Sequence, residues 1–180
     1  MESIETKRDA DLKDTKSKDL IVVLDETFYQ QTIEFLAGNI YAFGAKKLFL
    51  VDWRDAVTTH LGISLTHLPL KPAIKRTFIE RFMSAEECLG YLKQKNYTII
   101  AISSHLDDNK TNVMFHEVDF TKKKLAVWFG RSSKSVNNRC DDCVSVDVRG
   151  NVDYLNYDAL ITIVLNEIAK KRDEYNQKTQ

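Results

Sequence analysis

Two cysteines at a C-x-x-C spacing, Cys140 and Cys143, are the first residues whose types suggest chemistry. A structural zinc site takes four ligands, and neither Cys88 nor any histidine stands at a spacing that completes such a set. A redox dithiol would open a helix after an early strand, whereas this pair lies late in the chain, in a polar stretch. We interpret both residues as loop cysteines and predict no metal centre.

The histidines and glycines carry no familiar catalytic signature either. The four histidines are scattered, without the H-x-x-x-H spacing of a metal-binding helix. The chain has no G-x-S-x-G, Walker A or G-x-G-x-x-G motif, and it has only six glycines. These observations count against a nucleophile elbow and against a glycine-rich phosphate cradle.

A basic cluster follows a strand that is expected to end at Gly130, and it contains Arg131, Lys134 and Arg139. Ligands of parallel sheets bind beyond the carboxyl ends of the strands, and Lys and Arg side chains contact phosphates. We therefore regard this loop as a candidate contact for a nucleic-acid backbone, with an ordinary solvated loop as the alternative. The lysines at 122–124 are interpreted as part of a solvated turn before that strand.

Length and charge limit the classes of protein to consider. The 180 residues include 26 Lys+Arg and 26 Asp+Glu, and this balance counts against a strongly basic nucleic-acid module. Residues 1–19 have almost no apolar side chains and are predicted to form a solvated or mobile tail. Residues 20–172 are predicted to form one domain, and 173–180 a C-terminal tail.

The N-terminal segment lacks the apolar stretch of a signal peptide, and no apolar run approaches the ~18 residues that would span a bilayer. Three cysteines suit a reducing compartment. We expect a cytoplasmic protein without membrane contact, and a nuclear or organellar location stays open.

The elements that must position these residues alternate between strands and helices. Continuous apolar runs predict buried strands, whereas helical periodicity and capping residues predict helices. Strands are expected at 20–24, 47–51, 97–103, 113–118, 125–129 and 144–148; helices are expected at 30–43, after Pro72 as far as Phe82, from the Ser84–Glu87 capping box, and from Tyr154 with its last turn at 170–172. This alternation favours an α/β fold with a mostly parallel sheet and helices on both faces.

Three segments in order resemble the SpoU/TrmH branch of the SPOUT methyltransferases. In that family one strand ends in Gly-Asn-Glu, a segment like Ile-Pro-Met-x-Gly follows, and Ser-Leu-Asn-Val-Ser opens the last helix. The first family motif has a strand ending in Leu-Asp, as at Asp25, and a helix closing in Phe-Gly, as at Gly44. The later positions that match are Gly130, Gly150, Leu155 and Asn156. The resemblance covers about residues 20–172.

The resemblance implies S-adenosylmethionine as cofactor, a C-terminal trefoil knot in which the last segment passes through an earlier loop, and a homodimer through the first and last helices. It implies a cofactor pocket made mostly of backbone groups from three loops. The catalytic candidates are Asn156 and Asp158, and RNA would contact Arg131, Lys134 and Arg139. The cofactor-binding candidates are Ser103, Phe129, Gly130, Val146, Val148, Gly150 and Leu155.

The sequence departs from the family at three positions that matter for catalysis. The family's Asn falls on Thr32, its Glu on Ser132, and its Arg, held to help activate the ribose hydroxyl, on Gly38. General-base assistance is worth about 10²–10⁴-fold, and a glycine cannot provide it. Two functions stay open: an S-adenosylmethionine-dependent RNA ribose 2′-O-methyltransferase acting on tRNA or rRNA, and a catalytically inactive relative that binds RNA or a ribonucleoprotein as an assembly or scaffold protein. A dimeric structural protein without a cofactor is a third.

Overall fold

The structure is a computed structural model that describes residues 19–25, 30–51, 78–103, 113–130, 136, 139–146 and 157–178. Its centre is a seven-stranded sheet in the order β3-β2-β1-β6-β4-β7-β5, and every paired strand is parallel. The strands are β1 (Asp19–Asp25), β2 (Lys47–Val51), β3 (Ile79–Phe82), β4 (Thr98–Ser103), β5 (Val113–Met114), β6 (Lys124–Gly130) and β7 (Asp142–Ser145). The helices are α2 (Gln30–Ala42), α5 (Ala85–Gln94) and α7 (Tyr157–Lys178), with a short 3₁₀ turn η1 at Phe115–Glu117.

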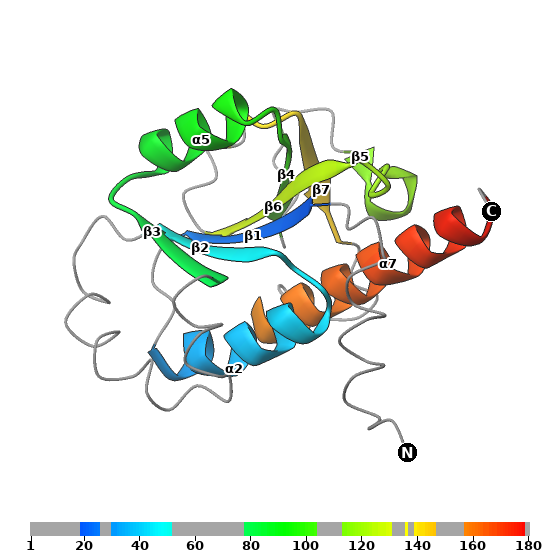
Figure 1. Cartoon of the computed structure of the whole chain (residues 1–180), viewed down its shortest axis with the longest axis horizontal. Helices are drawn as coiled ribbons and strands as arrows, with labels where there is room; N and C mark the ends of the chain where they lie inside the picture. Colours follow the sequence, from blue (N-terminus) through cyan, green and yellow to red (C-terminus); the bar gives the residue numbers. More distant parts are fainter. Residues whose placement is uncertain are drawn as a thin grey trace, which may run out of the picture.

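Helices cover both faces of this sheet, as predicted. Helix α5 lies over one face, while α2 and α7 lie side by side under the other (Figure 1). Alternation along β1 explains the two layers, because successive side chains of a strand point to opposite faces. Ile21 and Val23 join the core under α5, whereas Leu20, Val22 and Leu24 join the core above α2 and α7.

The predicted strands at 20–24, 47–51 and 125–129 are confirmed as β1, β2 and β6. Residues 20 to 24 are each at most 2% exposed, which is why this run is apolar throughout rather than alternating. Full burial of one such side chain stabilises the fold by about 1.5–3 kcal/mol. The buried centre of the sheet is therefore what the sequence specifies most strongly.

Local signals at two helix ends are also confirmed. Gly44 follows α2 with a φ of +79°, where its backbone N–H donates to Tyr41 O, and the next N–H, of Ala45, donates to Ile40 O. This pair of bonds is a Schellman motif, which favours glycine at the left-handed position. At the start of α5, the Glu87 N–H donates to Ser84 Oγ at 3.2 Å, and the Glu87 carboxylate accepts from the Met83 N–H at 2.9 Å.

One predicted helix is wrong over its second half. Residues Ile79–Phe82, expected to continue a helix from Pro72, form β3 at the edge of the sheet, in parallel register with β2. Only Phe82 of this strand is buried, where it packs on Phe49 with ring centroids 4.8 Å apart. A short, half-exposed strand with two charged residues in its middle has no apolar run to mark it. Residues 72–77 lie outside the described residues.

The strand expected at 144–148 begins earlier than predicted. It is β7, Asp142–Ser145, so Cys143 is a buried strand residue and not part of a polar loop. The Asp141 carboxylate accepts from the Ile99 N–H at 2.7 Å and the Asp141 N–H donates to Ile99 O at 2.9 Å, so this residue extends the ladder of β4 towards β7. Because the Asp141 side chain takes the place of a backbone acceptor, the apolar pattern of the sequence does not mark this part of the strand.

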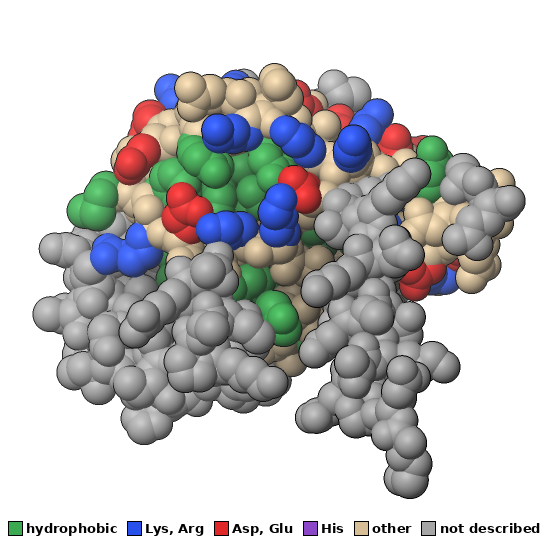
Figure 2. All heavy atoms as spheres, in the orientation of Figure 1, with side chains coloured by type: hydrophobic (Ala, Val, Ile, Leu, Met, Phe, Trp, Pro, Cys, Tyr) green, Lys and Arg blue, Asp and Glu red, His purple; other side chains and the backbone are tan. Residues whose placement is uncertain are grey.

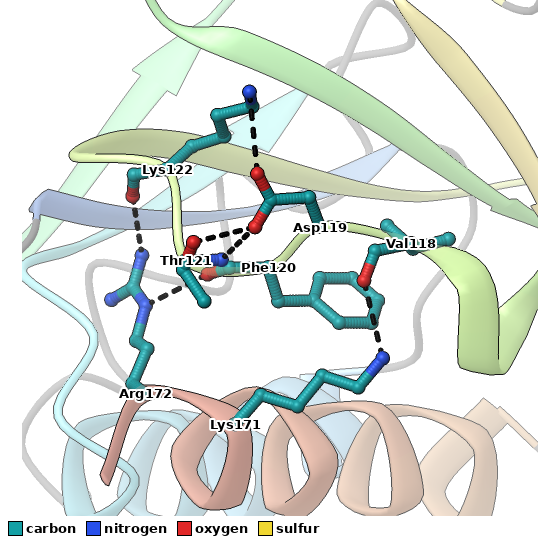
Figure 3. A network of polar contacts seen from close by, with 7 residues as sticks. All are labelled: Val118, Asp119, Phe120, Thr121, Lys122, Lys171 and Arg172. Atoms are coloured by element: carbon teal, nitrogen blue, oxygen red, sulfur yellow. Dashed lines mark hydrogen bonds and ion pairs between the residues drawn. The ribbon is translucent and has the colours of Figure 1, made fainter. Parts of the chain in front are cut away.

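The last helix is longer than expected and fixes a neighbouring turn. It does not end at residue 172 but continues to Lys178, through residues predicted to be a tail. Lys171 Nζ donates to the carbonyls of His116 and Val118 at 2.8 and 3.1 Å. Arg172 donates to the carbonyls of Phe120 and Lys122 at 3.2 and 3.4 Å (Figure 3). Burial lowers the pKa of Arg172 to about 10, partly offset by the negative charge of Asp19.

The predicted trefoil knot depends on residues 147–156, which lie outside the described residues, so it stays a prediction. Among the described helices, none is long and apolar enough to cross a bilayer.

Candidate functional site

The carboxyl ends of the four central strands lie together at one edge of the sheet. The register pairs Asp25 with Gly130, Ile102 with Phe129, and Ser103 with Ser145. The four strands differ in length, but this register places their last residues almost side by side. In open parallel sheets this edge is where ligands bind, so we take it as the candidate site.

Gly130 allows β1 and β6 to end in close contact. A Cβ atom at this position would lie 2.5 Å from the backbone oxygen of Asp25 and 2.8 Å from its Cβ. The obstructing atoms are the backbone and Cβ atoms of Asp25 in β1, which no side-chain rotation can move away. The absence of a side chain is thus required by the packing of the two strand ends, which is a physical reason for the glycine that the family motif contains.

Asp25 is a buried carboxylate directly beside that contact. The residue is 1% exposed, and its Oδ2 accepts a hydrogen bond of 3.1 Å from the indole Nε1 of Trp128. Buried charges are costly unless hydrogen bonds compensate them, so this bond stabilises the carboxylate under the sheet edge. The bond joins β1 to β6 on the α5 side, since Trp128 belongs to the core under α5.

Cys88 of α5 lies near the same carboxylate. Its thiol is fully buried, and burial raises its pKa, with further contributions from the negative charges of Asp25, Glu87 and Glu80. A thiol is nucleophilic only as the thiolate. Cys88 is therefore an inert core residue, and no described group around it supports a catalytic cysteine.

The cofactor candidates that the structure describes all lie at this edge. Ser103 ends β4, Gly130 ends β6, and Val146 follows β7 with 8% of its surface exposed. The Phe129 side chain is completely buried in the core above α2 and α7, so it supports the edge from beneath. Val148, Gly150 and Leu155 lie outside the described residues.

The other candidates are spread more widely. Asp158 is half-buried in the first turn of α7, where its backbone oxygen accepts from Thr162 Oγ1 at 2.8 Å. Arg139 is exposed and forms an ion pair of 3.6 Å with Glu86 of α5, and an exposed pair of this kind holds an arginine only weakly. Asn156, Arg131 and Lys134 lie outside the described residues.

Of the three positions that depart from the family pattern, the structure describes the surroundings of Gly38. Gly38 lies in the middle of α2, half-buried, directly after the buried Ala37. A helix residue without a side chain cannot reach the sheet edge. Nothing is described of the Thr32 side chain or of Ser132.

Two features of the candidate site were not found from the sequence. The Asp25–Trp128 hydrogen bond joins residues 103 positions apart, and the contact of Gly130 with the Asp25 backbone depends on strand register. The signal that could have suggested the first is an aspartate that closes a fully apolar strand. Within the described part of the chain, no group of three or more His, Cys, Asp or Glu side chains could hold a metal ion.

No protein-family profile matches the sequence, and no curated protein matches it. Solved structures do match. A TrmH/SpoU tRNA modifying enzyme from A. aeolicus superposes with a TM-score of 0.70 and 21% identity, covering 99% of this chain and 89% of that one.

Two further structures extend the likeness. A probable methylase family protein from Haemophilus influenzae matches with a TM-score of 0.70 and 17% identity, over 92% of this chain and 69% of that one. A SpoU methyltransferase from Streptomyces viridochromogenes in complex with AdoMet matches with a TM-score of 0.64 and 18% identity, over 87% and 58%.

The chain thus spans about nine tenths of the A. aeolicus enzyme but less than two thirds of the S. viridochromogenes one. The likeness covers the sheet and its helices. At identities of 17–21% it shows that the chains share a fold. This chain has the fold of the SpoU/TrmH methyltransferases.

Proposed function

We propose that this protein is an S-adenosylmethionine-dependent RNA ribose 2′-O-methyltransferase of SpoU/TrmH type, acting on tRNA or rRNA. The observation that carries the proposal is the sheet edge where β1, β6, β4 and β7 end together, with Gly130 held against Asp25. It is supported by the fold, which the chain shares with TrmH/SpoU structures.

The described part of the edge fits the proposed cofactor. An adenosyl group requires apolar contact and hydrogen-bonding groups placed beside it. Val146 is an apolar residue with 8% of its surface exposed at this edge, Ser103 and Gly130 end two adjacent strands, and Asp25 is paired with Gly130. When bound, S-adenosylmethionine would supply an electrophilic methyl group.

The chain's own contribution would be positioning. Bringing two reactants into the correct geometry can supply about 7–11 kcal/mol of the barrier, and strand ends that are buried and hydrogen-bonded provide a rigid support for it. Asp158, in the first turn of α7, and Asn156 are our candidates for contacting the ribose. The basic residues Arg131, Lys134 and Arg139 are our candidates for contacting the RNA backbone.

A second function is favoured by one specific observation. Gly38 stands within α2 where the family has its arginine, and it has no side chain to activate a hydroxyl group. A catalytically inactive relative that binds RNA or a ribonucleoprotein, as an assembly or scaffold protein, is consistent with that loss. Both proposed functions include binding of the cofactor at this edge, so the two are separated only by transfer of the methyl group.

Two measurements separate these functions. S-adenosylmethionine is titrated into the full chain by calorimetry, and labelled cofactor is then incubated with total RNA, followed by nucleoside analysis. The enzyme binds the cofactor and yields a labelled 2′-O-methylnucleoside. Cofactor binding without transfer to any RNA supports the inactive relative, and the absence of both overturns the proposal.

We also propose, from the same resemblance, a trefoil knot at the C-terminal segment and a homodimer in which α2 and α7 meet their counterparts. Exposed apolar side chains support the dimer. Tyr41 on α2 is 40% exposed, and Ile163 and Tyr175 on α7 are 43% and 45% exposed. The two helices lie side by side (Figure 1), so these side chains belong to one layer of the molecule.

A further inference from the structure

A basic and aromatic surface lies at the opposite edge of the sheet from the candidate site. We call it the amino-edge surface, and it consists of residues at or next to the amino ends of the strands and of the last turns of α5. Its members are Lys46, Lys47, Tyr91, Lys95, Tyr97 and Lys124. The chain as a whole has a net charge of zero, so a local excess of lysine here is a departure from the average.

The two lysines nearest the tyrosines contact neutral groups. Lys124 Nζ donates to the backbone oxygen of Lys95 at 2.9 Å and lies 5.6 Å from the centroid of the Tyr97 ring. Lys95 Nζ lies 6.0 Å from the centroid of the Tyr91 ring. Among the residues that the structure describes, no carboxylate forms an ion pair with these two ammonium groups, so their positive charge is available to an anionic ligand.

The other two lysines are each paired with a carboxylate. Lys46 Nζ contacts both carboxylate oxygens of Asp19, at 3.0 and 2.9 Å, and Lys47 Nζ contacts Glu80 at 3.2 Å. The Tyr97 hydroxyl donates to Asp19 at 3.3 Å. Asp19 and Glu80 therefore neutralise Lys46 and Lys47, and the positive charge left for a ligand is that of Lys95 and Lys124.

The tyrosine rings are half-buried and keep an accessible part. Both pack against the core under α5, and Tyr91 contacts Phe49 and Phe82 with centroids 5.6 and 5.5 Å apart. Figure 2 shows the result on this face: hydrophobic side chains gather in a patch below α5, with Lys and Arg side chains on both sides of it. Packing fixes the rings, so a ligand that stacks on them costs them little conformational entropy.

We propose that the amino-edge surface binds a single-stranded segment of RNA, with lysines on its phosphates and bases against the tyrosine rings. Single-stranded nucleic acids are held by positively charged grooves interleaved with aromatic side chains, and this surface combines both. An acidic protein would use the lysines but not the rings. The inference rests on RNA being the ligand of the proposed function, and it adds a second contact, separated from the candidate site by the length of the strands, about 20 Å.

The test uses fluorescence anisotropy of the full chain with a labelled, unstructured RNA of about 20 nucleotides. The variant Lys95→Gln/Lys124→Gln removes two charges without leaving a carboxylate unpaired. We expect its affinity to fall about tenfold, and the slope of log affinity against log salt to decrease by about 1.4, since each phosphate contact on a single strand contributes about 0.7. The matched control is Lys170→Gln/Lys178→Gln, at two exposed lysines of α7, which should leave both quantities unchanged.

A second variant tests the stacking part. Tyr97→Leu keeps an apolar side chain against the core but removes the ring, and we expect affinity to fall about tenfold. Tyr97→Phe keeps the ring and removes only the hydroxyl group that donates to Asp19, so this conservative variant should restore binding to the wild-type level.

The outcomes distinguish this inference from the proposed function. If the wild type binds RNA and the double-lysine variant binds it equally well, the amino-edge surface is not the contact, although RNA binding itself stands. If the wild type prefers polyglutamate to RNA, the surface recognises acidic protein and the inference is overturned. If RNA binding is lost in the variant while no methyl transfer is found in any sample, the surface is confirmed and only the enzymatic proposal fails.

Discussion

The absence of a side chain at Gly130 determines how closely strands β1 and β6 approach each other at the candidate site. The Asp25 backbone occupies the space that a Cβ would take, and the Asp25 carboxylate is tied to β6 through Trp128. A buried hydrogen bond to a charged group is worth about 1.5–3 kcal/mol. The Gly130 contact and the Asp25–Trp128 hydrogen bond thus fix the distance between the ends of β1 and β6.

Gly130→Ala should destabilise the protein, because the new methyl group forces two backbone strands apart. We expect a loss of about 1–3 kcal/mol in the free energy of unfolding, measured by urea denaturation followed by circular dichroism. Gly90→Ala is the control, since nothing lies within 4 Å of a Cβ there and alanine favours a helix by about 1 kcal/mol. Equal stability of Gly130→Ala and the wild type would contradict the close contact that we describe.

Tyr97 should give the protein a specific sensitivity to alkaline pH. Burial, followed by the charge of Asp19, raises its pKa from 10.0 to about 12. The folded state therefore retains the proton more tightly, so this contribution to stability is complete below pH 10 and is lost as the pH rises through about 12. Thermal unfolding at a series of pH values should show a steeper decline for the wild type than for Tyr97→Phe. Parallel curves for the two proteins would refute the assignment.

The elements differ in how far their sequences specify them. Strands β1, β2 and β6 are buried on both faces, so continuous apolar runs identify them. Strand β3 escapes prediction because Glu80 and Arg81 fill its half-exposed middle. In β7 the first residue is Asp142 and the preceding Asp141 bonds to β4 through its side chain, so the apolar pattern starts later than the strand.

The candidate site could be predicted only to the level of its edge. Ligands of parallel sheets bind beyond the carboxyl ends of the strands, and the resemblance to the SpoU/TrmH family proposed Ser103, Gly130 and Val146, which all lie at this edge. The hydrogen bond between Asp25 and Trp128 could not be predicted, because it depends on the register of two strands far apart in the sequence.

The capping box of α5 offers a test at the scale of one element. Ser84→Ala removes the hydroxyl oxygen that accepts from the Glu87 N–H, and such a loss typically costs about 1 kcal/mol. Chemical denaturation should report this decrease with an unchanged dependence on denaturant. Ser84→Asp, which keeps an acceptor at the cap, should retain most of the stability; if it is as unstable as Ser84→Ala, the hydroxyl has another role.

The whole molecule has two edges of different character. The carboxyl edge combines a buried carboxylate with strand ends, and the amino edge carries the lysines and tyrosines proposed to hold RNA. The whole chain has a net charge of zero, and our proposals assign cofactor binding to the carboxyl edge and RNA binding to the amino edge. The helices α2 and α7 form a third surface, which our proposal assigns to a second copy of the chain.

Ile163→Glu should weaken the proposed dimer, since it places a charge on an exposed apolar position of α7. Sedimentation equilibrium should give twice the chain mass for the wild type and a mass closer to one chain for the variant. Gln177→Glu, in the exposed last turn of the same helix, makes the same change in charge and should leave the dimer intact. A monomeric wild type at micromolar concentration would remove this part of the account.

The most direct measurement is calorimetric titration of S-adenosylmethionine into the wild type, Gly130→Ala and Gly90→Ala, with each fold checked by circular dichroism. Our account predicts one cofactor per chain for the wild type and Gly90→Ala, and at least tenfold weaker binding for folded Gly130→Ala, about 1.4 kcal/mol or more. A wild type that releases no heat of binding, or a Gly130→Ala variant that binds as tightly as Gly90→Ala, would contradict it.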